Sequence, residues 1–313
     1  MEVVHTLDGV VTPEGCVVTI GAYDGVHRGH QAVIDQVRRE AAVRNCRSVL
    51  VTFDRHPATV VRPESAPHLL CDLDQKLELL SVTGLDLTVV VEFTEDRARE
   101  SPEDFVSEVL VNALRTKAVV VGEDFHFGYH RRGNVELLRH VGASNGFEVL
   151  PVELVTRDDG VAEPVSSTAI RRALAGGEVD VARRLLGHPY AVRGIVVRGD
   201  QRGRQIGVPT ANVEVPAAMC LPADGVYAGF YTRPGGRRYA CAINLGRRPT
   251  FYEHADHSLL EAHLLDFDEE IYGERAEVAF DSFLRSERKF EGLDALVTQL
   301  KLDIEAARRA TIT

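Results

Sequence analysis

The sequence predicts two domains: a layered α/β domain with a parallel sheet, followed by an antiparallel β-barrel and a terminal helix. Its 313 residues exceed the usual size of one domain, and 44% hydrophobic residues can supply a core for each of two. In the first half, apolar β-branched runs alternate with segments of helical periodicity. In the second half, strand-like runs follow one another without intervening helices. The pattern of the first half is typical of an α/β layered domain, and that of the second half is typical of an antiparallel sheet or barrel.

The first half contains five runs that are typical of buried parallel strands. Between them, Val33, Val37 and Ala41 share one face of a helix that follows His30, and Ser101 and Pro102 suit the N-cap and first position of another. Parallel strands need such crossover helices. The strand runs are 16–20, 47–53, 87–93, 117–122 and 148–155.

The second half begins with two helical segments, 167–174 and one that Gly187 is placed to end. Strand-like runs separated by Gly, Pro and Asp turns follow. A last helix, expected to pack onto the barrel, carries its apolar face at Leu293, Leu296, Leu300 and Ile304. We therefore predict domains at 1–185 and 186–313, with barrel strands at 191–199, 225–231, 239–246, 259–267 and 275–284.

Composition argues against several classes of protein. The net charge of −11 disfavours a general affinity for nucleic acids or anionic membranes, so neither is expected as a partner. Apolar runs fall short of the ~20 residues of a membrane span, and the N-terminal residues lack the pattern of a signal peptide, which together favour a cytoplasmic protein. The five scattered cysteines favour neither disulfides nor a zinc site, and we expect them to be buried small side chains.

The stretch "GAYDGVHRGH" joins a strand to a helix and carries two histidines three residues apart, His27 and His30. Gly21, Gly25 and Gly29 permit tight backbone geometry there. Two surface histidines or a metal site would fit the spacing, although a metal needs a third ligand. Phosphate binding explains more, because the helix N-terminus would face the carboxyl edge of the sheet, where anions are favoured.

A later stretch, "SSTAIRRAL", could be an ordinary helix N-cap. In the second half, "GDQRGRQIGVPTAN" combines a glycine-rich turn with Thr210 and Asn212, which would share a face if the chain is extended. Hydroxyl and amide oxygens are ligands suited to Mg²⁺. Glu261 lies on a predicted strand with Leu260 and Ala262 on the opposite face, and although strand glutamates are usually solvated, it could serve as a base.

With these motifs in order, the sequence resembles the nucleotidylyltransferase superfamily and, more narrowly, the prokaryotic bifunctional riboflavin kinase/FAD synthetases, from about residue 17 to 307. The resemblance implies a Rossmann-like N-terminal adenylyltransferase domain in which His27 and His30 steady the transition state. It implies ATP contacts at Gly21, Tyr23, Asp24, Gly29, Ser166, Ser167, Thr168 and Arg171. Two further loops, whose motifs are less specific, are implied to contact FMN at Phe53, His56, Pro57, Asp124 and Phe125.

For the C-terminal kinase domain, the resemblance implies Glu261 as the catalytic base and Thr210 and Asn212 as Mg²⁺ ligands. Flavin contacts are expected at Arg285 and Glu287, with Asn244 and Thr250 as weaker candidates. The implied ATP contacts are Gly199, Gly203, Arg204, Gly207, Pro209, Thr210 and Asn212.

The resemblance implies phosphorylation of riboflavin by ATP to FMN, then adenylylation of FMN to FAD with release of pyrophosphate, so that ATP and riboflavin or FMN are the small-molecule partners. Two alternatives are a single-activity adenylyltransferase and a flavin sensor with dead catalytic motifs. Both would lose the "PTAN" motif or Glu261, and the sequence keeps both.

Overall fold

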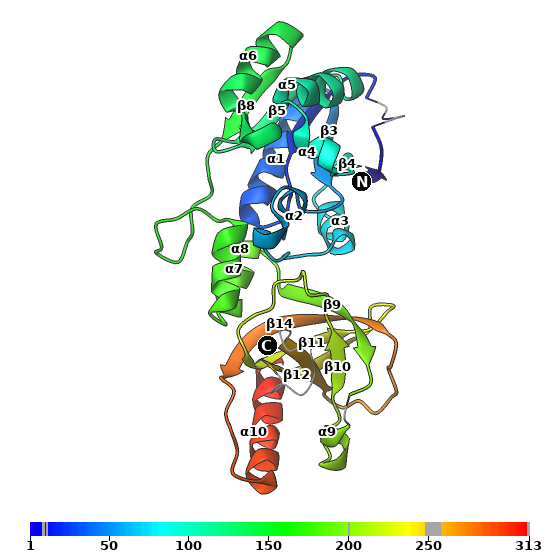
Figure 1. Cartoon of the computed structure of the whole chain (residues 1–313), viewed down its shortest axis with the longest axis vertical. Helices are drawn as coiled ribbons and strands as arrows, with labels where there is room; N and C mark the ends of the chain where they lie inside the picture. The colour runs from blue at the N-terminus through cyan, green and yellow to red at the C-terminus, as the bar shows by residue number, and fades with distance from the viewer. Residues whose placement is uncertain (8–9, 11, 200, 248–257, 312–313) are drawn as a thin grey trace. The chain divides into compact units, whose positions relative to one another are not determined.

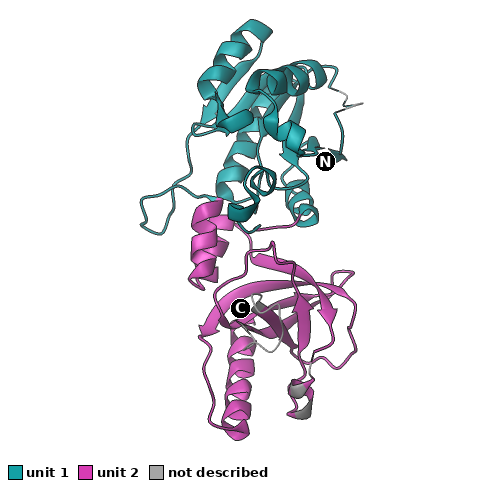
Figure 2. Ribbon diagram, viewed as in Figure 1, with its two compact units in different colours: residues 1–69, 73–166 teal, residues 70–72, 167–313 magenta. Residues whose placement is uncertain are grey.

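The computed structural model describes residues 1–7, 10, 12–199, 201–247 and 258–311. The chain divides into two compact units, 1–69 with 73–166, and 70–72 with 167–313 (Figure 2). The domain boundary at residues 185 and 186 remains a prediction.

Unit 1 is built on a six-stranded sheet in the order β1-β4-β3-β2-β5-β8, in which every neighbouring pair is parallel (Figure 1). The five predicted strands are confirmed. The edge strand β1 was not predicted, because three residues are too short to show a pattern. The strands are β1 (Glu2–Val4), β2 (Cys16–Ile20), β3 (Arg47–Phe53), β4 (Leu87–Val91), β5 (Thr116–Gly122) and β8 (Glu148–Val152).

Helices cover both faces of this sheet, as the alternation along β2 shows. Val17 belongs to a core that includes Ile34, Val37 and Ala41 of α1, whereas Cys16 and Val18 belong to the core on the opposite face. The helices are α1 (Arg28–Val43), α2 (Ala58–Val61), α3 (Leu73–Ser81), α4 (Glu95–Arg99), α5 (Pro102–Phe105), a π-helix (Val106–Ala113) and α6 (Val135–Asn145). Two short 3-10 helices (Pro63–Ser65, Tyr129–Arg131) and the ribbon β6 (His126–Phe127) with β7 (Gly133–Asn134) complete the unit.

The strand order creates a switch point beside β2. The chain adds β3 and β4 on one side of β2, then returns to add β5 and β8 on the other. In open α/β sheets, ligands bind outside the carboxyl ends of the strands at such a point. The segment that leaves β2 there begins at Gly21, so the histidine-containing turn lies where a ligand is expected.

Unit 2 contains a closed antiparallel barrel in the order β10-β13-β12-β11-β14-β9. Five strands were predicted, and the "PTAN" segment supplies the sixth, β10. The barrel strands are β9 (Tyr190–Val197), β10 (Ala211–Glu214), β11 (Gly225–Thr232), β12 (Arg238–Arg247), β13 (Ser258–Leu264) and β14 (Arg275–Arg285). The short helix α9 (Arg202–Gln205) lies in the glycine-rich loop between β9 and β10.

Three further helices pack within unit 2. α7 (Ser167–Ala175) is tied by a hydrogen bond from Ala223 N to the Leu174 carbonyl, and α8 (Val179–Leu186) ends at Gly187 as predicted. α10 (Leu293–Thr311) packs on β11 and β12 through Ala307, with Ile304 and Ala310 beside it. The predicted apolar face is wrong at its start, because Leu293 is 61% exposed and the helix first meets the barrel further along.

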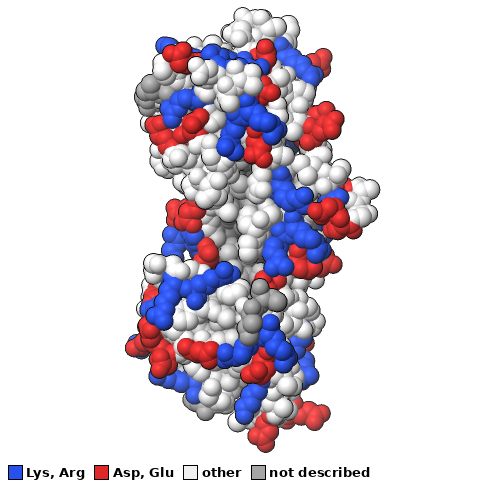
Figure 3. Space-filling model, turned by 180° about the vertical axis from the view of Figure 1, so that it is seen from behind, with Lys and Arg blue, Asp and Glu red and all other residues white. Residues whose placement is uncertain are grey.

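The surface and the cysteines agree with the composition. On the face that Figure 3 shows, basic and acidic side chains are interspersed over each unit. Four cysteines are buried and Cys46 is partly buried, all as free thiols. Within the described ranges, no helix is long and apolar enough to cross a membrane.

Candidate functional sites

The turn after β2 is a strained connection into α1. Gly25 has φ of 81°, which glycine tolerates, but Tyr23 (50°) and Val26 (40°) also adopt the left-handed region. Such conformations cost of order 1–3 kcal/mol each and cluster at functional sites. Tyr23 and Asp24 are buried, and the Tyr23 hydroxyl hydrogen-bonds Thr19 at 2.6 Å, so the turn is anchored to the core of unit 1.

His27 and His30 stack on each other at this turn, with ring centroids 3.6 Å apart. His27 is the N-cap of α1, and its Nδ1 accepts a hydrogen bond from the His30 backbone N–H at 3.3 Å. Its neutral ring therefore carries its proton on Nε2. Burial lowers the pKa of His30 well below its usual value, and the electrostatic influence of His27 and Lys76 lowers it further. His30 is thus neutral at pH 7.

The hydrogen-bonding groups at this turn suit an anion. No group of three or more His, Cys, Asp or Glu side chains that could hold a metal occurs in the part of the chain that the structure describes. The buried Nδ1 of His30 has no hydrogen-bond partner among those residues. The first N–H groups of α1 also lack partners within the helix. A phosphate can accept hydrogen bonds from these N–H groups and from Nδ1 of His30 in the tautomer that carries its proton there.

Two more predicted loops leave neighbouring strands at the same sheet edge. Phe53 ends β3 and packs edge-to-face on Phe93, with the ring centroids 5.1 Å apart. Nδ1 of His56 accepts a hydrogen bond from the backbone N–H of Ala58.

The other loop follows β5. Its Phe125 stacks on Phe127, with the ring centroids 5.4 Å apart. Pro57 lies beside His56 at the start of α2, and Asp124 precedes Phe125, with Oδ1 close to the backbone of Gly122. Because β3, β2 and β5 are adjacent and parallel, the structure brings these loops to the edge occupied by the histidines.

The second predicted signature spans the division between the units. Ser166 ends unit 1, whereas α7 begins at Ser167 in unit 2 and carries Thr168 and Arg171 on its first turns. The predicted start of a helix at Ser167 is confirmed. The contacts of these side chains with ATP remain predictions.

In the barrel, the predicted kinase residues form a row across three strands. Asn212 on β10 is directly opposite Glu261 on β13, and Glu261 is directly opposite Asn244 on β12. Directly opposed residues project from the same face, with Cβ atoms ~4.5–5.5 Å apart. Leu260 and Ala262 are fully buried on the other face, as the alternation predicted. An acid thus lies between two amides.

The glycine-rich loop folds closely over this row. A Cβ on Gly199 would lie 2.5 Å from Nδ2 of Asn212, and a Cβ on Gly203 would meet the Val208 carbonyl and lie 3.6 Å from Oγ1 of Thr210. Asn212 is only 7% exposed, yet its Oδ1 has no hydrogen-bond partner among the described residues. An unpartnered buried oxygen is costly, so this atom is a candidate metal ligand. Arg204, Gly207 and Pro209 of this loop are exposed.

The two predicted flavin contacts of the kinase domain lie near the end of β14. Arg285 donates to both carboxylate oxygens of buried Asp303, at 2.9 and 2.6 Å, and so ties β14 to α10. Glu287 lies against the backbone of Gly246, and burial raises the pKa of its carboxyl. Thr250 lies outside the described residues.

Sequence reasoning missed Lys76, a buried cation of unit 1. It lies on α3, is 6% exposed, and donates to the Phe53 carbonyl at 3.1 Å and to Thr52 Oγ1 at 3.4 Å. Its charge contributes to the lowered pKa of His30. The only signal in the sequence is its spacing from Leu80 on the buried side of α3, and lysine rarely occupies such a position.

Comparisons with known proteins match both halves of the chain. The FAD synthetase family matches residues 10–169, and the riboflavin kinase family matches residues 186–311. The bifunctional riboflavin kinase/FMN adenylyltransferase of Escherichia coli K12 is 38% identical over 295 residues, covering 94% of this chain and 92% of its own. The Listeria monocytogenes protein of the same name is also 38% identical, covering 93% and 91%.

A solved structure supports the fold. The crystal structure of a Streptococcus pneumoniae protein named a macrolide-efflux protein has a TM-score of 0.85 and 30% identity, covering 98% of each chain. Two family matches in order, together with relatives matched over nearly their whole length, establish the assignment. The chain belongs to the bifunctional riboflavin kinase/FMN adenylyltransferase family, which phosphorylates riboflavin to FMN and adenylylates FMN to FAD.

Proposed function

We propose that the barrel face carrying Asn212, Glu261 and Asn244 performs the kinase reaction and that the histidine turn of unit 1 performs adenylyl transfer. The direct pairing of Asn212 with Glu261 carries the first assignment. It places a carboxylate next to an unsatisfied buried oxygen under a loop rich in backbone donors. Phosphoryl transfer needs this combination of a base, a metal ligand and a phosphate cradle.

In the kinase reaction, Glu261 accepts the proton of the terminal ribityl hydroxyl as that oxygen attacks the γ-phosphorus of ATP. Oδ1 of Asn212 and the hydroxyl of Thr210 would hold Mg²⁺, and the hard oxygen donors and the lack of a partner at Oδ1 fit that ion. Bound Mg²⁺ would neutralise charge on the phosphates. Gly199, Gly203 and Gly207 of the glycine-rich loop would contact the phosphates, and Arg285 and Glu287 would contact the flavin.

In adenylyl transfer, the FMN phosphate attacks the α-phosphorus of ATP in line, and pyrophosphate leaves. His27 donates from Nε2, the nitrogen that its N-cap bond leaves protonated. Neutral His30 donates to a second phosphoryl oxygen, so both rings stabilise charge without becoming nucleophiles. Gly29 and the first turn of α1 bind phosphate oxygens, and Ser166, Ser167, Thr168 and Arg171 hold the leaving pyrophosphate.

Two product assays test this division. The protein is incubated with riboflavin, ATP and Mg²⁺, and then separately with FMN, ATP and Mg²⁺, and flavins are resolved by chromatography. We expect FMN and FAD in the first and FAD in the second. Unchanged riboflavin would refute the kinase site, and unchanged FMN would refute the adenylyl site.

We further propose that the enzyme acts in the cytoplasm, where its substrate ATP is available, and that it binds neither nucleic acid nor membranes. The net charge of −11 supports the second statement, because both kinds of surface are anionic.

A further inference from the structure

A β-hairpin lies between β8 and Ser166. Val165 N donates to the Val155 carbonyl at 2.8 Å, Arg157 N donates to the Glu163 carbonyl at 3.2 Å, and Thr156 forms a bridge with Pro164. These bonds define two arms, and the return arm ends at the first residue of the second adenylyl-transfer signature. The position of the hairpin therefore sets the position of Ser166, the first residue of this signature.

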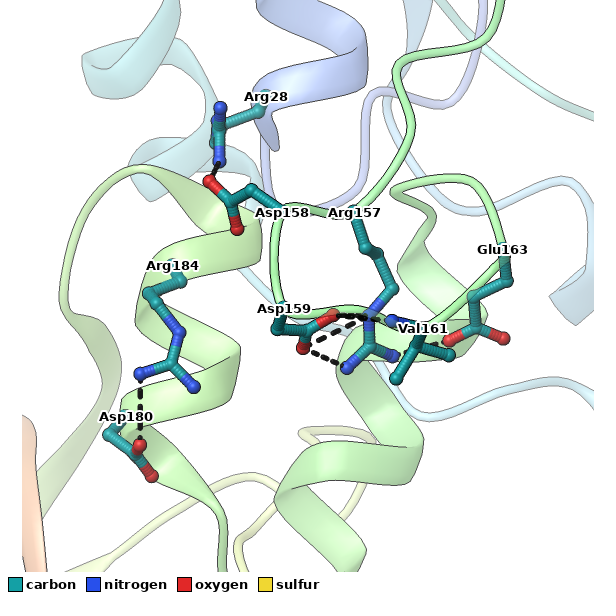
Figure 4. Close-up of polar contacts among 8 residues, drawn as sticks. All are labelled: Arg28, Arg157, Asp158, Asp159, Val161, Glu163, Asp180 and Arg184. Carbon is teal, nitrogen blue, oxygen red and sulfur yellow. Dashed lines mark hydrogen bonds and ion pairs between the residues drawn. The ribbon is translucent and has the colours of Figure 1, made fainter.

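Arg157 braces the hairpin from within. Its side chain is only 8% exposed and contacts the carboxylates of Asp159 and Glu163 (Figure 4). Nε lies 2.9 and 3.2 Å from the two oxygens of Asp159. A guanidinium held by two carboxylates fixes both arms and the tip. These contacts hold the two arms and the tip of the hairpin together.

Two contacts join this hairpin to the histidine turn. At the base, a Cβ on Gly29 would lie 3.1 Å from the Val165 carbonyl, so the glycine permits close approach. At the tip, Nη1 of Arg28 forms an ion pair with Oδ2 of Asp158 at 2.6 Å (Figure 4). Arg28 lies between the two histidines in sequence and is the first residue of α1. The contact at Asp158 attaches the tip of the hairpin to the start of α1.

We propose that Arg28 and Asp158 are a positioning pair for adenylyl transfer, holding the hairpin, and hence Ser166, against the histidine turn in the geometry that binds ATP. The inference rests on the function proposed for unit 1. Asp158 keeps the Arg28 guanidinium at the tip of the hairpin. Without this carboxylate, the hairpin keeps its internal bracing but loses this attachment to α1, so ATP binds to a looser site.

The test is Asp158→Asn, assayed for FAD formation from supplied FMN. An exposed ion pair contributes only modestly, so we expect KM for ATP to rise by no more than about fivefold, with kcat within a factor of about two. Asp158→Glu, which keeps the charge, should restore much of the affinity. The matched control is Asp35→Asn, which breaks the exposed Asp35–Arg38 pair of the same helix and should leave KM unchanged.

Salt and the kinase reaction supply two further readouts. Added NaCl screens an exposed pair, so it should raise KM more steeply in the wild type than in Asp158→Asn. Riboflavin phosphorylation should be unchanged in every variant. The proposal is overturned if Asp158→Asn leaves KM at the wild-type value, or if it lowers both activities together. A wild-type protein that makes no FAD from FMN would instead refute the proposed function.

Discussion

Single residues acquire their roles here from where the backbone puts them. A glutamate on a strand is ordinarily solvated, but Glu261 lies between Asn212 and Asn244 on one face of the barrel. A histidine after a glycine turn is ordinarily exposed, but His30 is stacked on His27 with its Nδ1 buried. In both cases burial or register, rather than residue type, distinguishes a site from a surface side chain.

Replacing Glu261 separates the two activities. Glu261→Gln keeps the shape of the side chain but removes the base, so FMN formation should fall by about 10²–10⁴-fold. FAD formation from supplied FMN should persist. The control is Glu214→Gln at the exposed end of β10, which should leave both rates unchanged. Equal loss of both activities would contradict two separate sites, and both are measured by chromatography of the flavins.

His30 should make the stability of unit 1 depend on pH. Burial lowers its pKa in the folded state, so below the unfolded value of 6.5 the unfolded chain binds more protons. The stabilisation is therefore complete above pH 6.5 and declines as pH falls toward the folded pKa, by at most ~1.4 kcal/mol per pH unit. Urea unfolding between pH 7.5 and 5.5 should show a shallower pH dependence for His30→Gln.

The control for this measurement is His140→Gln, which changes an exposed histidine on α6. This variant should keep the pH dependence of the wild type. A His30→Gln protein with the same slope as the wild type would show that His30 does not titrate differently in the folded state.

The helices and strands that the sequence predicted are those with a strong local pattern. The start of α1, the Ser101 N-cap of α5 and the Gly187 end of α8 were all predicted, because caps are local chemistry. The short strand β1 carries no such pattern. Nor could the sequence show that Asn212 pairs with Glu261, since register between distant strands depends on the closed barrel. The burial of Lys76 is likewise a result of tertiary packing.

The glycine-rich loop depends on close approach to β10. Gly199→Ala would place a Cβ 2.5 Å from Nδ2 of Asn212, which must then shift. We expect the kinase rate to fall at least about tenfold, as misplacement by ~1 Å can cost more than that. Adenylyl transfer should be unaffected. Gly292→Ala, where a Cβ meets nothing within 4 Å, is the control, and an unchanged kinase rate in Gly199→Ala would contradict the loop's assigned role.

At the scale of the whole molecule, two compact units each keep a fold suited to one reaction. The parallel sheet offers a switch point with a helix N-terminus, and the barrel offers a face on which an acid and two amides align. The histidine turn depends on the sheet of unit 1, and the row of Asn212, Glu261 and Asn244 depends on the barrel of unit 2. FMN is the product of one reaction and a substrate of the other, so it connects the two.

This arrangement predicts that two variants, each defective in a different one of the two activities, complement each other. Glu261→Gln lacks the kinase base, and His30→Gln should lose about two to three decades of adenylyl transfer if it acts like a removed oxyanion donor. Mixed together with riboflavin, ATP and Mg²⁺, they should form FAD after a lag that shortens as protein concentration rises, because FMN must pass between molecules. The double variant on one chain should form neither FMN nor FAD at an appreciable rate. If the mixture accumulates FMN without FAD, while Glu261→Gln alone still converts supplied FMN, then FMN is retained by the molecule that made it.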